Sequence, residues 1–208
     1  MEETFNITVE MLNVKGACAS GMRDFLKEFP REQYPDGADY QEVLNRCAEH
    51  ERANYAEWLL NEFGATNATL SVDKINTDGY VFFAGRIEAR GEIRCKAIMA
   101  GREIKAGRGI KAGEGIEAGR DIEAGWGIKA GEGIKAGEGI EAGESIEAGR
   151  DIEAGEGIKA GRGIKAGEDF GVYAGLAVRL SDKSQYAKIT AKEKPANIIC
   201  GEWVPFDD

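Results

Sequence analysis

The hydrophobic positions of the chain follow two different periods, the first of which is helical. Near the N-terminus, residues 8–15 form a short amphipathic stretch, and Ser20 is placed to cap a second helix. Apolar residues at helical spacing predict two further helices, which begin near Tyr40 and Ala53. Residues 1–64 are therefore expected to form a small helical domain. Its core is marginal in size and is expected to pack against the adjacent part of the chain.

The second period is six residues long and dominates the rest of the chain. The frame Ile-[Lys/Glu]-Ala-Gly-x recurs eleven times, with isoleucine at positions 104, 110, 116, 122, 128, 134, 140, 146, 152, 158 and 164. This period does not match a helix, and each repeated glycine would cost a helix about 1 kcal/mol. In Ile-x-Ala the isoleucine and the alanine point to one face of a strand. Stacking many such hexads buries both residues, which predicts a parallel β-solenoid.

The number of hexads in one coil can be argued from the charges at the second position of the hexad. Two hexads per coil would make eight of nine stacked pairs opposite in charge, and three would make six of eight. Opposite pairs stabilise neighbouring strands by about 0.2–1 kcal/mol. The count favours a flattened coil of twelve residues, and a triangular coil of eighteen stays open.

The sequence therefore predicts an α+β chain built from a helical domain and a hexad-repeat solenoid. The helical domain covers residues 1–64, irregular first coils cover 65–103, and the regular solenoid covers 104–175. Residues 176–208 lose the repeat and are expected to form a C-terminal cap over the exposed edge of the last coil.

Charge and composition favour a protein-binding role over catalysis. The net charge of −10 disfavours direct contact with nucleic acid or anionic membranes and favours a partner with a basic surface. The one histidine, His50, lies in the helical domain, so neither a histidine-dependent transferase nor a histidine metal site is expected on the solenoid. We expect no enzyme activity, no cofactor and no metal.

Cysteine spacing and hydropathy indicate an intracellular chain. Four cysteines lie far apart and are interpreted as reduced, mostly buried thiols. The sequence contains neither a signal peptide nor a membrane span, so a cytoplasmic location is expected. Homodimerisation stays open.

Several motifs outside the repeat carry a resemblance that extends over nearly the whole chain. These are KGAC at residues 15–18, AEWLL at 56–60 and KPANIICGEW at 194–203, around the GIKAGEGIEAG repeats. This layout resembles a group of proteins encoded by phages and prophages. The resemblance implies a small phage accessory protein that acts in the host cytoplasm, a class in which inhibitors of bacterial defence, such as anti-CRISPR proteins, are common. It implies no catalytic or binding residue.

The fifth position of the hexad and the residue after it supply the candidate binding residues. A tryptophan at an otherwise charged position, Trp126, is a candidate contact residue, unless it packs on the helical domain. The carboxylates of the turns form a candidate phosphate-mimicking strip, unless they serve only solubility. The predicted partner-binding residues are Trp126, Glu132, Glu138, Glu144, Asp121, Asp151 and Glu156.

These observations lead to one functional hypothesis and two alternatives. The hypothesis is a non-catalytic binding protein that blocks a host defence complex, of the CRISPR type, sterically or by acidic mimicry of DNA. One alternative is a sponge for a nucleotide immune signal, which needs a pocket where Arg86, Arg90, Arg94 and Arg102 gather. The other is a structural component of a virion or of its assembly.

Overall fold

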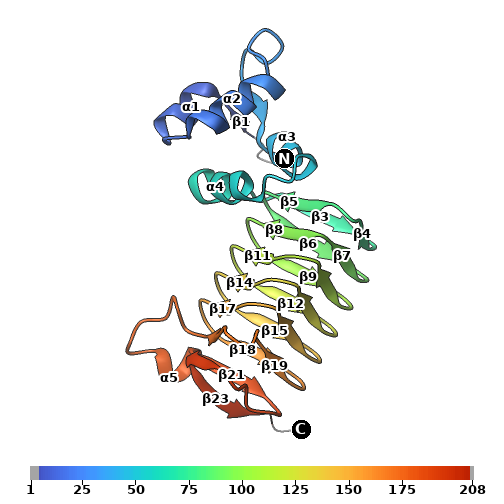
Figure 1. Ribbon diagram of the computed structural model, residues 1–208, viewed down its shortest axis with the longest axis vertical. Helices are drawn as coiled ribbons and strands as arrows, with labels where there is room; N and C mark the ends of the chain where they lie inside the picture. Colours follow the sequence, from blue (N-terminus) through green and yellow to red (C-terminus); the bar gives the residue numbers. More distant parts are fainter. Residues whose placement is uncertain (1–4, 207–208) are drawn as a thin grey trace.

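The computed structural model describes residues 5–206, which form a helical domain at one end of a long parallel β-solenoid (Figure 1). The expected α+β architecture is confirmed. Four helices make up most of the helical domain: α1 (Val9–Val14), α2 (Ala19–Glu28), α3 (Tyr40–Glu49) and α4 (Ala53–Phe63). Two short strands, β1 (Asn6–Ile7) and β2 (Ala38–Asp39), pair antiparallel beside them.

Side chains cap three of these helices. Thr8 Oγ1 accepts a hydrogen bond from the Met11 N–H at 3.2 Å, and Asp39 Oδ1 accepts one from the Glu42 N–H at 3.0 Å. Helix α2 differs from the prediction, because Cys18 and not Ser20 is its capping residue. The group that caps the N-terminus of α2 is therefore a thiol and not a hydroxyl.

The solenoid consists of three parallel sheets that share one core. The eight-stranded sheet contains β3 (Thr69–Val72), β6 (Arg86–Ala89), β9 (Ile104–Ala106), β12 (Ile122–Ala124), β15 (Ile140–Ala142), β18 (Ile158–Ala160), β21 (Lys188–Ala191) and β23 (Glu202–Pro205). The six-stranded sheet contains β4 (Ile75–Asn76), β7 (Ile93–Cys95), β10 (Ile110–Ala112), β13 (Ile128–Ala130), β16 (Ile146–Ala148) and β19 (Ile164–Lys165). The seven-stranded sheet contains β5 (Tyr80–Phe83), β8 (Ala97–Ala100), β11 (Ile116–Ala118), β14 (Ile134–Ala136), β17 (Ile152–Ala154), β20 (Val172–Tyr173) and β22 (Ile198–Cys200).

One coil of the regular repeat contains three hexads, so the predicted coil of twelve residues is wrong. Ile110 pairs with Ile128, and Ile128 pairs with Ile146, each 18 residues further along. Two stacked pairs of like charge result, Lys111 with Lys129 and Glu123 with Glu141. Such exposed pairs cost less than the backbone packing that sets the coil, which is why counting charges gave the wrong answer.

Isoleucine and alanine fill the core of the solenoid, as the hexad predicts. Every repeat isoleucine is at most 5% exposed, and the strands carry lysine or glutamate outward. The first glycine of most hexads is required by the stacking itself. At Gly131, a Cβ atom would collide with the carbonyl oxygen of Gly113 in the preceding coil. Backbones in close contact, and not a positive φ angle, therefore explain this glycine.

The helical domain shares its core with the first complete coil of the solenoid. Phe82 points outward from β5, is 3% exposed, and belongs to the apolar core around α3 and α4. The side-chain amide of Gln41 donates to the carbonyl of Phe82 at 2.8 Å and accepts from the N–H of Ala84 at 2.9 Å. A side chain of helix α3 therefore continues the hydrogen bonding at the edge of the sheet. The helical domain packs against the solenoid, as expected.

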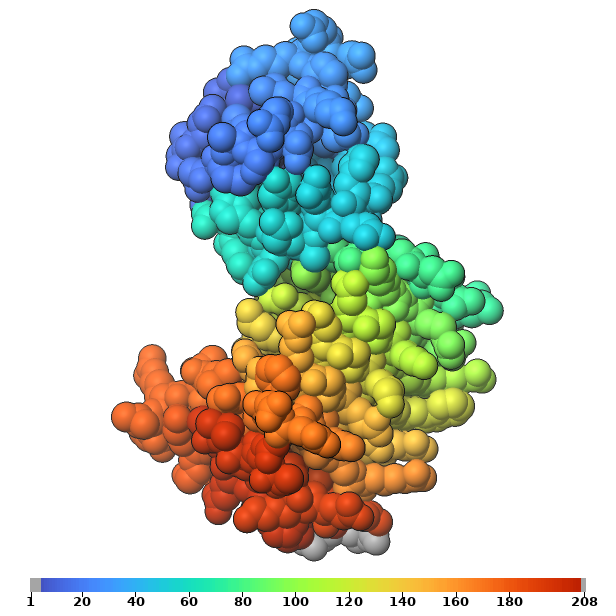
Figure 2. All heavy atoms as spheres, viewed as in Figure 1, coloured from blue at the N-terminus to red at the C-terminus, as the bar shows by residue number. Residues whose placement is uncertain are grey.

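The C-terminal segment extends the solenoid before it ends. Strands β21, β22 and β23 add to two of the sheets in parallel register. A loop and α5 (Lys183–Tyr186) project from the side of the stack (Figures 1 and 2). In the last strand, Pro205 has no N–H to donate to a further strand, which limits pairing at this edge. None of the helices in residues 5–206 has the length and apolar character that crossing a bilayer requires.

Candidate functional site

The structure places the turn residues of successive hexads at three different corners of the solenoid. Residues 18 apart are stacked neighbours, so residues six apart lie at different corners. Glu132, Glu138 and Glu144 therefore occupy three separate corners. Trp126 stacks on Glu144, and Glu138 stacks on Glu156. The predicted acidic residues therefore do not form one strip, although Asp121 and Glu156 lie beside Glu138 at a single corner.

Arginines of adjacent coils neutralise three of these glutamates. The ion pairs are Glu132 with Arg150 at 3.0 Å, Glu138 with Arg120 at 3.8 Å, and Glu144 with Arg162 at 3.8 Å. An arginine beside each carboxylate lowers the net negative charge at that corner, which disfavours mimicry of a phosphate backbone.

The two predicted aspartates support the stacking of coils. Asp121 Oδ1 accepts a hydrogen bond from the Gly139 N–H at 2.9 Å, and Asp151 Oδ1 accepts one from the Gly171 N–H at 2.8 Å. Both bonds reach the following coil. These side chains therefore have a structural role that the sequence pattern did not reveal.

Trp126 lies at the corner between β12 and β13 and is 55% exposed. Its ring centre is 5.4 Å from the guanidinium carbon of Arg108 in the preceding coil. It is not part of the apolar core of the helical domain, so it does not take the structural role considered for it. Its backbone contributes to the hydrogen bonds between stacked coils, because its N–H donates to the carbonyl of Arg108 at 3.1 Å.

The four arginines expected to line a nucleotide pocket lie apart. Arg86 is held by Glu103 at 2.9 Å, and Arg90 by Asp73 at 3.3 Å. Arg102 donates to the Asn67 side chain at 2.7 Å, and Arg94 points outward from β7 on another sheet. None of these four side chains lines the groove of the helical domain described next.

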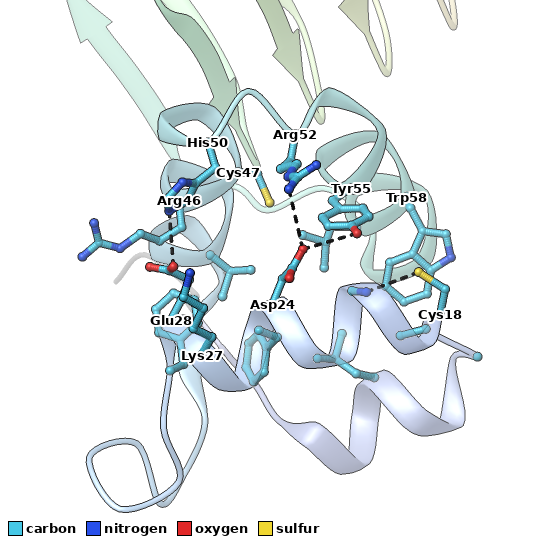
Figure 3. Close-up of a pocket in the computed structure, with 18 residues that line it drawn as sticks. Cys18, Asp24, Lys27, Glu28, Arg46, Cys47, His50, Arg52, Tyr55 and Trp58 are labelled. Atoms are coloured by element: carbon cyan, nitrogen blue, oxygen red, sulfur yellow. Dashed lines mark hydrogen bonds and ion pairs between the residues drawn. The ribbon is translucent and has the colours of Figure 1, made fainter.

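A groove of about 260 Å³ lies in the helical domain, between α2 on one side and α3 and α4 on the other (Figure 3). Its walls are mostly apolar and include Phe25, Val43, Trp58 and Leu59. This space can accept one or two apolar side chains of a partner. Helical periodicity marks these residues as core, but the sequence contains no signal for the gap between the helices.

Polar groups line the rim of the groove. Asp24 accepts a hydrogen bond from the Tyr55 hydroxyl at 3.5 Å, and Glu28 lies 3.3 Å from His50 Nε2. Cys18 and His50 lie at opposite ends of the groove, so the thiol has no histidine base beside it (Figure 3). Within residues 5–206, no group of three or more metal-ligating side chains could hold a metal ion.

Cys18 is exposed and Cys200 is partly exposed, whereas Cys47 and Cys95 are buried, so the expectation of buried thiols holds for two of the four cysteines. Hydrogen bonds with the Ser20 hydroxyl at 3.2 Å and from the Gly21 N–H at 3.4 Å lower the pKa of the Cys18 thiol. Burial raises the pKa values of Cys47 and Cys95 to about 12.

We therefore expect iodoacetamide to alkylate Cys18 first in the folded protein near neutral pH, because the reactive species is an accessible thiolate. Cys47 and Cys95 should react only after unfolding. Peptide mass spectrometry over time checks this order, with Cys18→Ser as the control that removes the fast phase. Equal rates for Cys18 and Cys47 would contradict the arrangement.

Comparisons with known proteins concern the helical domain. Searches of curated proteins and of solved structures gave no match. A family model does match residues 1–67, which contain all four helices of the domain and end before Phe82. Over residues 1–67 the chain is therefore similar to the YdhT N-terminal domain family.

Proposed function

We propose that this chain is a non-catalytic binding protein that holds a partner protein at the corner of the solenoid around Trp126. The observation that carries the proposal is the 55% exposure of this side chain. The equivalent position is charged in all the remaining repeat hexads. Tryptophan and arginine are enriched among the residues that dominate binding energy at interfaces. The Arg108 contact orients the ring and leaves one of its sides available.

The rest of the solenoid supports a role as a rigid platform. Its strands follow one another in a continuous parallel register from β3 to β23, so the corner residues keep fixed spacings. A preorganised surface loses little conformational entropy when a partner binds. The rigidity of the solenoid and the position of Glu132, Glu138 and Glu144 at separate corners both favour steric blocking of a partner over mimicry of a nucleic acid.

As the target we propose a host protein or nucleoprotein complex, in particular one that handles nucleic acid in defence. This part of the proposal draws on the sequence resemblance to phage-encoded proteins. It requires no turnover and no cofactor. The protein would act in the cytoplasm of the host by occupying a surface that the complex needs.

Affinity capture from bacterial lysate tests the proposal. We expect Trp126→Ala to weaken capture of the partner by about 2 kcal/mol, roughly 30-fold, as for a binding hot spot. Tyr186→Ala removes another exposed aromatic side chain, 46% exposed on α5, and should leave capture unchanged. Equal recovery with both variants, or no recovered partner, would refute the proposal.

A further inference from the structure

On the side of the preceding coils the surroundings of Trp126 are basic, although the chain as a whole is acidic. Stacking places Arg94, Lys111 and Lys129 in one outward column on β7, β10 and β13. Arg108 and Trp126 form a second column at the neighbouring corner, three residues before Lys111 and Lys129 along the chain. All five side chains are exposed. We call this group the cationic patch.

Most charges of the patch have no carboxylate partner. In the described part of the chain, Arg94, Arg108 and Lys111 form no ion pair, and only Lys129 has one, with Glu147 at 2.7 Å. Elsewhere on the solenoid, stacked lysines and glutamates pair across coils, for example Lys105 with Glu123 at 2.6 Å. Like charges on adjacent strands repel, so the patch destabilises the free protein slightly. A bound anionic group would relieve the repulsion.

The patch is short. Neighbouring strands are about 4.8 Å apart, so the column from Arg94 to Lys129 is roughly 10 Å long. The next coil ends it with Glu144 and Glu147. An extended peptide rises about 3.3 Å per residue, so about three residues span the column. A long polyanion would instead meet the acidic residues beyond this coil and the net charge of −10.

We propose that the cationic patch binds a short acidic segment of a partner protein, with carboxylates on Arg94, Arg108 and Lys111 and an apolar side chain on the ring of Trp126. This inference rests on the proposed function for the existence of a partner, and it specifies the chemistry of the contact. The net charge of the chain predicts a basic partner, whereas the patch selects an acidic segment on it. The patch is therefore the local exception that determines which part of the partner docks here.

Two double variants of equal charge change test this inference. Arg94→Glu with Lys111→Glu cancels the net positive charge of the patch, because Arg108 and Lys129 remain. Lys159→Glu with Lys165→Glu makes the same change of charge on exposed lysines of the last regular coil. Circular dichroism checks that both remain folded. The probes are a fluorescent peptide with two glutamates on each side of a phenylalanine and a fluorescent oligothymidylate of similar charge, and the readout is anisotropy.

We expect the peptide to bind, to weaken as salt rises, and to lose roughly tenfold in affinity in the patch variant only. Equal losses in both variants, tighter binding of the oligothymidylate, or no peptide binding would each overturn the inference. The capture experiment separates the two proposals. If Trp126→Ala abolishes capture but the patch variant does not, the binding function stands and the acidic contact is wrong. If neither variant changes capture, both are wrong.

Discussion

Gly131→Ala is expected to destabilise the solenoid by about 3 kcal/mol, at the upper end of the range for overpacking a well-packed interior. The added methyl group would collide with the carbonyl oxygen of Gly113 in the coil before it. That oxygen belongs to the backbone and cannot rotate away as a side chain could. The two coils would have to separate, which weakens the ladder on both sides of the corner.

Gly133→Ala is the matched control for this prediction. It lies in the same turn, and the atom nearest to a Cβ there is the carbonyl oxygen of Asp151 at 3.4 Å, an ordinary contact. Because the φ angle of Gly133 is not positive, alanine should be neutral or stabilise by up to about 1 kcal/mol. Urea unfolding followed by circular dichroism measures both variants. Similar free energies of unfolding for the two would show that the coils are not in close contact.

Phe82→Ala is expected to destabilise the helical domain by about 3–5 kcal/mol, the usual cost of removing a buried phenylalanine. Phe82 is 3% exposed, and its ring centre is 5.6 Å from that of Tyr80. It points away from the solenoid core, so its loss should leave the stacked coils intact. The helical signal in circular dichroism should therefore melt earlier than the β signal.

Phe170→Ala provides the comparison for this experiment. Phe170 is 37% exposed near the other end of the solenoid, so its removal should change the free energy of unfolding by less than about 1 kcal/mol. An unchanged melting temperature of the helices in Phe82→Ala would contradict the shared core. The same core means that residues 1–67, which match a family model, share buried apolar contacts with β5 in this chain.

The sequence predicts the strands of the solenoid far better than its cross-section. Ile-x-Ala specifies inward and outward faces locally, so the strands from β9 to β19 follow from the hexad. The observed coil of three hexads brings two backbones close together at Gly131 and its equivalents, at a distance that no single hexad specifies. Weak charge pairs on the surface do not control that distance, and an inference based on them therefore favoured the wrong coil.

The wrong coil length also explains why the sequence did not reveal which residues of the candidate site are neighbours. Glu132, Glu138 and Glu144 are regular neighbours in the sequence but lie at different corners, whereas Lys111 and Lys129 are stacked. Without the length of the coil, the cationic patch is invisible in the sequence. Trp126 could be selected from the sequence alone because it interrupts a charged series, and such an exception needs no knowledge of the coil.

The three-hexad coil also relates the length of the solenoid to its direction. Adding three hexads would insert one coil and move the helical domain about 4.8 Å further from the C-terminal strands without turning it. Adding or removing a single hexad would turn the helical domain by roughly a third of a turn about the long axis. Natural variants that differ by whole coils would thus keep the relative orientation of the two ends and change only the distance between them. Variants that differ by one hexad would present the helical domain to a different side.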